Sequence, residues 1–245
     1  MTNGNLGITR SEEWFKQELR YHGAIVENSH MVEEDGTHID GCINMDKIDG
    51  RTELIIQIGR AIAAGMFRHE AEIQESLSYQ EKEMPIVVIG QGPLGKSIAE
   101  STAIAFGCEN FAWCEIRRFF KKPKHSDAVW SDCNPQMPNI VRGARCYIVN
   151  GALTEESFIP EMARLIDEHK GIFAGVVVVA KSDSYSIDTS VRIPWFHSLI
   201  TVGKISKWPM NVPCRQCSRV VKMKVTTERA HRWCDEHPDY PIDYN

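Results

Sequence analysis

The chain has 245 residues, of which 42% are hydrophobic and 25% charged, as in a globular protein with one good-sized domain and a small appendage, or with two small domains. A formal net charge of −5 excludes the overall basic character of many nucleic-acid-binding proteins. No apolar run reaches the roughly 18 residues of a membrane helix, and the first residues lack the basic and apolar regions of a secretory signal, so we expect a cytoplasmic protein.

The first part of the chain predicts two helices separated by an extended region. Thr9 and Glu12 form a capping box for a helix that reaches about residue 22. Residues 24–48 have an extended pattern, with a hairpin turn signal at Asp35-Gly36. A second helix with one apolar face is expected after residue 50.

The middle of the chain alternates strands and helices. Strands are expected at residues 86–89, 110–116, 146–149 and 172–180, and helices at residues 97–106 and 158–169. The basic segment after residue 116 and the stretch up to Asn139 are expected to form a mobile loop. The last strand is apolar throughout, which is typical of a parallel strand covered on both faces. This order predicts an α/β fold with right-handed crossovers.

The segment GQGPLGKS, from Gly90 to Ser97, allows three interpretations. As a P-loop, its backbone N–H groups would hold phosphate, Lys96 would reach across it and Ser97 would bind magnesium. That motif also needs an acid at the end of a later strand, but the next strand ends in Asn150-Gly151. A dinucleotide-binding fingerprint fits the chain less well, because about 85 residues precede the strand that would have to be the first of that fold. The third interpretation is a plain tight turn.

Several segments, in order, resemble the orotate phosphoribosyltransferase-like family. GTHIDGCIN, from Gly36 to Asn44, is similar to the family's SGxHSDGYxN, and IGQGPLGKSIAESTA resembles its strand and pyrophosphate loop. VRGARCYIVNGALTEES resembles VxGKRVLVVEDxxTTGGS, while FAWCEIRR, GIFAGVVVVAKS, PWFHSLITV and PCRQC resemble later family segments. The resemblance, which runs from Gly36 to Cys217, implies a type I phosphoribosyltransferase fold: a mostly parallel sheet with flanking helices and an N-terminal hood. A small C-terminal zinc-knuckle-like segment is expected in addition, from the separate cysteine and histidine pattern of the tail.

The resemblance and the change in composition at about residue 207 together predict three parts of the chain. Residues 1–50 are expected to form the N-terminal helix and hood, residues 51–206 the α/β core, and residues 207–245 a Cys/His-rich tail. A nucleotide, nucleobase or phosphoribosyl ligand would bind where the loops 90–97 and 150–157 meet. The expected ligand-binding residues are Gly92, Gly95, Lys96, Ser97, Asn150, Thr154 and Ser157, with Lys121 and Lys122 of the basic loop.

The chemistry of that site departs from the family pattern. Asn150 and Gly151 replace the paired acids that the family places beside the ribose. Glu155 and Glu156 stand where the family has a cradle for the 5′-phosphate, and two carboxylates would repel that phosphate. An alternative is that both are the acidic first turn of a helix, which the helix dipole favours. The basic segment around Lys121 could close over pyrophosphate, contact nucleic-acid phosphate or be a solvated loop.

These departures favour a binding or effector role diverged from the orotate-type transferases, with a defence or toxin complex as one setting. One alternative is an active phosphoribosyltransferase that uses magnesium, or an N-glycosidase with Glu155 or Glu156 as general acid or base. The other is a P-loop nucleotidase. The expected partners are a nucleotide or phosphoribosyl small molecule, a second copy of the chain in a homodimer, and a protein or nucleoprotein complex, but no membrane.

The tail carries a separate pattern of metal ligands. Eight cysteines in a cytoplasmic chain are expected to be reduced thiols or metal ligands. Cys214 and Cys217 form one pair at x2 spacing, and Cys234 and His237 form another. Three thiolates and one imidazole suit a structural, tetrahedral zinc ion. His231 competes for the fourth position, and unliganded thiols are the alternative.

Overall fold

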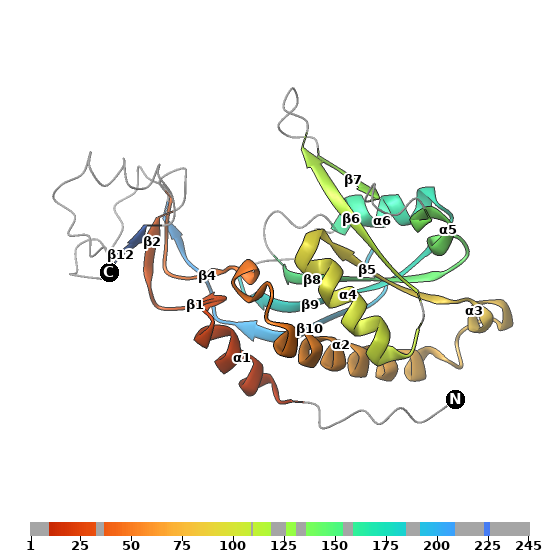
Figure 1. Ribbon diagram of the computed structural model, residues 1–245, viewed down its shortest axis with the longest axis horizontal. Helices are drawn as coiled ribbons and strands as arrows, with labels where there is room; N and C mark the ends of the chain where they lie inside the picture. The colour runs from red at the N-terminus through yellow and green to blue at the C-terminus, as the bar shows by residue number, and fades with distance from the viewer. Residues whose placement is uncertain are drawn as a thin grey trace.

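The computed structural model describes residues 10–32, 37–108, 110–118, 126–130, 136–153, 159–184, 192–208 and 223–225. Its main body is a six-stranded sheet with helices on both faces, and two smaller sheets lie at one end (Figure 1). The strand order of the main sheet is β10-β9-β8-β5-β6-β7. All neighbours in it are parallel except β6 and β7. The predicted α/β fold, with a mostly parallel sheet and flanking helices, is confirmed.

The main body contains the following strands and helices. The strands of the large sheet are β5 (Ile86–Gln91), β6 (Phe111–Arg118), β7 (Ser126–Trp130), β8 (Arg145–Leu153), β9 (Ile172–Ser182) and β10 (Phe196–Val202). The helices around it are α2 (Thr52–Ile73), α3 (Tyr79–Glu83), α4 (Gly92–Phe106), α5 (Met137–Val141) and α6 (Ile159–Glu168).

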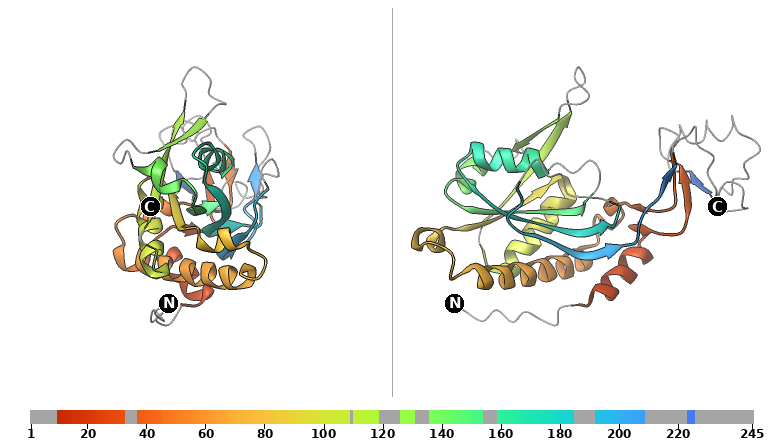
Figure 2. Two further views of the ribbon diagram at one scale, coloured as in Figure 1. Left: turned by 90° about the vertical axis from the view of Figure 1, so that its right-hand side faces the viewer. Right: turned by 180° about the vertical axis from the view of Figure 1, so that it is seen from behind.

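The two faces of the sheet build two hydrophobic cores. Side chains alternate along a strand, so Tyr147 and Val149 of β8 belong to the core formed with α2 and α4. Cys146 and Ile148 belong to the core formed with α5 and α6. Both faces of the central strands are therefore apolar, which explains the unbroken apolar runs in the sequence. Figure 2 shows α2 and α4 on one side of the sheet and α6 on the other.

The hood consists of the N-terminal elements at one end of the main sheet (Figure 1). Its elements are α1 (Glu12–Tyr21), β1 (Ile25–Val26), β2 (His30–Val32), β3 (His38–Ile39), β4 (Cys42–Ile43) and the 3₁₀ helix η1 (Met45–Ile48). Strands β1 and β4 pair antiparallel, and β2 and β3 form the hairpin that the sequence predicted. Two strands from the tail, β11 (Lys207–Trp208) and β12 (Met223–Val225), complete a four-stranded sheet in the order β11-β3-β2-β12. The three-part division of the chain stays a prediction.

Several predicted boundaries are wrong. Ser11, not Thr9, caps α1, since its side chain accepts a hydrogen bond from the Trp14 backbone N–H over 3.2 Å. Part of the predicted loop before Asn139 is regular structure, because β7 pairs antiparallel with β6 and α5 follows. Strand β8 continues to Leu153, where it still pairs with β9. Pairing with a distant strand stabilises these residues, and local sequence patterns do not report it.

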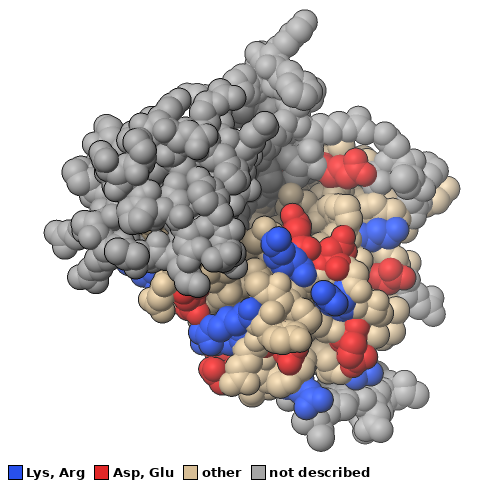
Figure 3. Space-filling view, turned by 60° about the vertical axis from the view of Figure 1, so that its left-hand side comes forward, with Lys and Arg blue, Asp and Glu red and all other residues tan. Residues whose placement is uncertain are grey.

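No helix within the described ranges is long and apolar enough to cross a membrane. On the face in Figure 3, the acidic and basic side chains of the described residues are interspersed. Burial raises the pKa of the Cys108 thiol to about 11 and that of the Cys114 and Cys146 thiols to about 12, so these three cysteines are protonated. All three are free cysteines, as the sequence predicted.

Candidate functional site

The main sheet has a topological switch point between β5 and β8. From β5 the chain passes through α4 to β6 on one side, whereas from β8 it passes through α6 to β9 on the other. Helix α4 packs on one face of the sheet and α6 on the opposite face. In open α/β sheets, ligands bind outside the carboxyl ends of the strands at such a point. The carboxyl ends of β5 and β8 are therefore the candidate site.

Two amide side chains meet at this edge. Asn150 of β8 donates a hydrogen bond from its Nδ2 to Oε1 of Gln91, the last residue of β5, over 3.1 Å. The Oδ1 of Asn150 accepts a hydrogen bond from the Gly151 backbone N–H over 2.7 Å, which fixes the orientation of the amide. Strands β5 and β8 are direct neighbours, with Gly90 opposite Val149. The two segments that the sequence placed in one site thus lie side by side.

The glycine segment forms a tight strand-to-helix junction. Helix α4 begins at Gly92, directly after β5, and Gly92 has a φ of +66°, in the left-handed region that favours glycine. A Cβ on Gly90 would lie 2.0 Å from the Gly95 carbonyl oxygen, so only glycine allows β5 and α4 to approach so closely. The first turn of α4 has no acidic side chain and no side-chain cap. Its N–H groups and the helix dipole favour an anion at this end.

Lys96 and Ser97 lie inside α4 rather than in a loop. The Lys96 Nζ is 4.2 Å from the centroid of the Trp113 ring on β6, a cation–π contact. The Ser97 hydroxyl donates to the Pro93 carbonyl oxygen over 3.3 Å, within the helix. The helix was expected to begin at Ser97, but α4 already begins at Gly92, so the glycine loop is shorter than the sequence predicted. The P-loop alternative stays a prediction.

The position of the second family acid is packed with apolar side chains. Gly151 is buried, and a Cβ on it would lie 2.9 Å from the Cβ of Met45 in the hood and 3.5 Å from Cδ2 of Leu94. Residues 150–153 belong to β8, so the part of the expected loop that the structure describes is strand. An acidic side chain at position 151 has no space in this structure.

The remaining predicted site residues lie outside the described residues. They are Lys121, Lys122, Thr154, Glu155, Glu156, Ser157, Cys214, Cys217, Cys234 and His237, with the alternative ligand His231. Within the ranges that the structure describes, no group of three or more His, Cys, Asp or Glu side chains could hold a metal ion. The zinc and magnesium expectations stay predictions.

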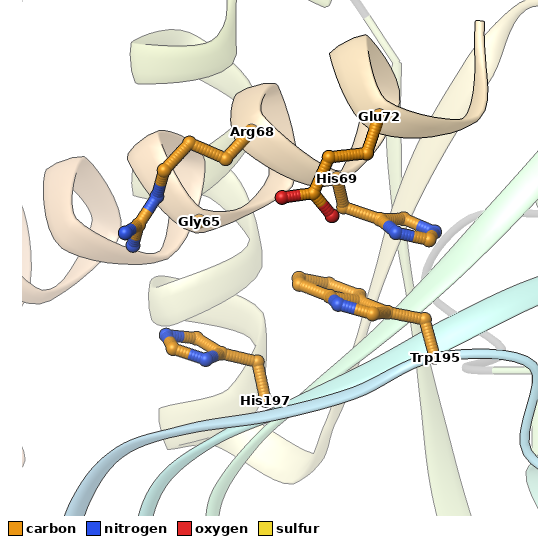
Figure 4. Close-up of a pocket in the computed structure, with 6 residues that line it drawn as sticks. All are labelled: Gly65, Arg68, His69, Glu72, Trp195 and His197. Atoms are coloured by element: carbon orange, nitrogen blue, oxygen red, sulfur yellow. The ribbon is translucent and has the colours of Figure 1, made fainter. Parts of the chain in front are cut away.

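A separate pocket of about 190 Å³ lies between α2 and the edge strand β10 (Figure 4). Its lining residues are Gly65, Arg68, His69, Glu72, Trp195 and His197. The His69 ring stacks on Trp195 with 4.4 Å between centroids and 7° between planes, and His197 lies nearly parallel to Trp195 with 5.8 Å between centroids. Burial lowers the pKa of His69 and of His197, so both imidazoles are neutral at pH 7. The sequence carries no signal for this pocket, because the charged face of α2 resembles an ordinary solvated helix face.

A buried polar cluster lies beneath His69. Glu70 of α2 forms an ion pair with Arg145 and accepts a hydrogen bond from the Tyr147 hydroxyl. Arg145 is 5% exposed and Tyr147 is fully buried. Burial, with Glu70 alongside, raises the pKa of Tyr147. The cluster joins the C-terminal half of α2 to the beginning of β8, so its role is to anchor the helix on the sheet.

Comparison with known proteins gives structural relatives only. No family model matches the chain, and no curated protein matches its sequence significantly. Among solved structures, it is similar to the orotate phosphoribosyltransferases of Aeropyrum pernix (12% identity, 76% of this chain and 92% of that chain, TM-score 0.49) and of Mycobacterium tuberculosis in complex with inorganic phosphate (14%, 78% and 88%, TM-score 0.46).

It is also similar to the UMP synthase of Leishmania donovani, with 11% identity and a TM-score of 0.45. The match covers 80% of this chain but only 37% of that larger protein. The solved structures named here include orotate phosphoribosyltransferases, the same kind of enzyme that the ordered segments of the sequence resemble.

Proposed function

We propose that this chain binds a nucleotide or phosphoribosyl ligand at the carboxyl ends of β5 and β8 and serves as a binding or effector protein. The observation that carries this proposal is the hydrogen bond between Asn150 and Gln91 at the switch point of the sheet. It places two polar side chains where an open α/β sheet binds its ligand.

The chemistry of this edge suits a ligand with a phosphate and a polar, uncharged part. The N-terminus of α4 favours the phosphate, because its first N–H groups have no partner within the helix. The amides of Gln91 and Asn150 each offer a donor and an acceptor, which suits the hydroxyls of a sugar or the edge of a base. Both side chains at this edge are neutral, so they do not repel phosphate.

Loss of transferase chemistry follows from positions 150 and 151. The resemblance implies that the family uses paired acids beside the ribose, and neither acid is present in this chain. The contact of Gly151 with Met45 also leaves no space for one of them. A magnesium-assisted departure of pyrophosphate therefore lacks the carboxylates that the family pattern provides.

Isothermal titration calorimetry with phosphoribosyl pyrophosphate, pyrophosphate and UMP tests the proposal. We expect at least one of them to bind, and Gln91→Leu and Asn150→Leu each to weaken binding about tenfold or more through loss of a half-buried polar contact. Gln74→Leu, an exposed position at the end of α2, is the matched control and should bind normally. No binding by the unaltered chain, or equal binding by all variants, would contradict the proposal.

Activity assays test the proposed absence of turnover. Magnesium-dependent release of pyrophosphate from phosphoribosyl pyrophosphate and a pyrimidine base would identify an active transferase instead. Release of free base from a nucleoside, lost in Glu155→Gln or Glu156→Gln, would identify an N-glycosidase. Ligand binding with neither reaction supports the binding or effector role.

A further inference from the structure

The pocket between α2 and β10 has a floor that is fixed before any ligand arrives. The floor is the half-buried indole of Trp195, which directly precedes β10. A Cβ on Gly175 would lie 3.0 Å from Cε3 of Trp195, so the indole packs directly against β9. The Tyr147 ring meets Trp195 edge-on, with 5.8 Å between centroids, and His69 stacks on it. The part of the indole that lines the pocket offers an apolar surface with an electron-rich face.

Two opposite charges on α2 line the pocket without pairing with each other. Arg68 and Glu72 are four residues apart, which makes them neighbours on one face of the helix. In α6, Arg164 and Glu168 have the same order and spacing and form an ion pair of 2.8 Å. Among the described residues, Arg68 and Glu72 form no ion pair, and Figure 4 shows their charged groups on different sides of the pocket. The pocket therefore keeps a cation and an anion available to a ligand.

Each of these charges acts on a different histidine of the pocket. Burial lowers the pKa of His197, and the positive charge of Arg68 adds to this effect. Burial also lowers the pKa of His69, whereas the negative charges of Glu70 and Glu72 oppose the effect. Both imidazoles are neutral at pH 7, so Arg68 and Glu72 carry the formal charges among the lining residues, all of which the structure describes. The pocket thus has a cationic end and an anionic end.

The size and the charges of the pocket restrict the kind of ligand. Its volume of about 190 Å³ is below the roughly 300–1,000 Å³ of pockets for drug-sized molecules, while a cavity of about 150 Å³ holds benzene. The ligand is therefore small. Glu72 repels an anion and Arg68 repels a cation, so a molecule with one charge of each sign is favoured over both. The two charged residues start about one helical turn, roughly 5 Å, apart along α2, which suits charges on neighbouring carbon atoms.

We propose that this pocket binds a small zwitterion, a free α-amino acid, with its carboxylate on Arg68, its ammonium on Glu72 and its side chain on Trp195. A guanidinium binds a carboxylate through two parallel hydrogen bonds. An ammonium pairs with a carboxylate and is also attracted to the face of an indole. The pocket lies beside the beginning of β10, at the opposite end of the parallel strands from the switch point. The proposal is therefore independent of any ligand at the carboxyl ends of β5 and β8.

Calorimetry with matched ligands is the first test. The full-length chain is titrated with the standard L-amino acids, and the one that binds best is compared with two derivatives. Its primary amide lacks the carboxylate, and its N-acetyl derivative lacks the ammonium. We expect each derivative to bind about tenfold more weakly, since each loses one charged hydrogen-bonding partner. Binding of both derivatives as tight as that of the amino acid, or no binding by any amino acid, would overturn the proposal.

Substitutions on the exposed rim assign each charge to its partner. Arg68→Gln should weaken the amino acid about tenfold but leave the affinity for the amide unchanged, because the amide has no carboxylate to lose. Glu72→Gln should likewise weaken the amino acid but not the N-acetyl derivative. Arg60→Gln, also exposed on α2, is the control and should bind the amino acid normally. An affinity for the amino acid that is the same in all three variants would contradict the proposal.

The same variants separate this site from the one at the switch point. Arg68→Gln and Glu72→Gln should bind phosphoribosyl pyrophosphate, pyrophosphate and UMP as the unaltered chain does, whatever that affinity is. Asn150→Leu should in turn bind the amino acid normally. Loss of amino-acid binding in Asn150→Leu, with normal binding in the Arg68 and Glu72 variants, would move the amino acid to the carboxyl ends of β5 and β8 and overturn the proposal.

Discussion

Asn150 Nδ2 lies 3.1 Å from Gln91 Oε1, and this hydrogen bond joins the carboxyl ends of two neighbouring parallel strands at the switch point of the main sheet. Both side chains are half-buried, so each amide exchanges part of its contact with water for contact with the other. The Oδ1 of Asn150 accepts a hydrogen bond from the Gly151 backbone N–H. The edge is therefore organised before any ligand arrives.

A double-mutant cycle measures the strength of this contact. We expect Gln91→Ala and Asn150→Ala each to lower the free energy of unfolding by about 0.5–1.5 kcal/mol, the net value of a typical hydrogen bond. In the double variant the free energy of unfolding should fall by less than the sum of the two single effects, because the contact can be removed only once. The difference, a coupling energy, should be about 1 kcal/mol. Urea denaturation provides the measurement. Strict additivity would show that the two amides do not interact in solution.

The contact between Gly151 and Met45 predicts a steric cost for any side chain at position 151. Gly151→Ala should lower the free energy of unfolding by about 1–3 kcal/mol, because its Cβ overlaps the buried Met45 side chain. In a Met45→Gly background the same substitution should cost clearly less, since the Met45 Cβ and Cγ that the new Cβ approaches are both gone. Chemical denaturation of the four chains tests this. An equal cost in both backgrounds would mean that Met45 is not the obstacle.

Gly90 and Gly92 are expected to respond very differently to alanine. Gly90→Ala places a Cβ 2.0 Å from a backbone oxygen of α4, so it should cost more than about 4 kcal/mol or prevent folding. Gly92→Ala meets no atom within 4 Å and should cost only about 1–2 kcal/mol for its left-handed φ. Circular dichroism and urea denaturation compare the two. Similar stabilities would be inconsistent with the close approach of β5 and α4.

Glu70 is expected to be the most sensitive acidic position of α2. Glu70→Gln leaves the buried guanidinium of Arg145 without an anionic partner and should lower the free energy of unfolding by about 3–5 kcal/mol. The Nε and Nη1 atoms of Arg145 are buried without partners, so they cannot compensate. Glu72→Gln, on the exposed rim of the pocket two residues further on, is the control and should change stability by less than about 0.5 kcal/mol. A small effect at Glu70 would mean that water reaches Arg145.

The stability of the fold should fall as the pH falls below the ordinary histidine range. Burial lowers the pKa of His69 and His197 from 6.5, and nearby Arg68 adds to the effect on His197. As the pH falls below 6.5, these histidines become protonated in the unfolded chain before they do in the folded chain. The free energy of unfolding is therefore highest above pH 6.5 and decreases until the pH reaches the lowered pKa values of the folded state. Urea midpoints at about pH 7.5 and about pH 5.5 test this, and the decrease should be smaller in a His69→Gln, His197→Gln chain. An unchanged midpoint would show that both rings protonate as easily in the folded state.

The predictable part of the fold comes from local patterns. The apolar runs of β5, β8 and β9 and the apolar face of α2 are visible in the sequence, because burial imposes a period of two or 3.6 on neighbouring residues. Strand β7 was missed because its stability depends on pairing with β6 at the sheet edge. The extension of β8 to Leu153 was missed for the same reason, since β9 continues beside it to Ser182.

The sequence by itself determined the alternation of strands and helices, the glycine junction after β5 and the absence of acids at positions 150 and 151. Only the tertiary structure decided that Gln91 and Asn150 touch, that Met45 of the hood fills the space beside Gly151, and that His30 meets His38. The physical reason is range. Backbone conformation and periodic burial depend on near neighbours in the chain, whereas side-chain contacts depend on the path of the whole chain, which brings distant residues together.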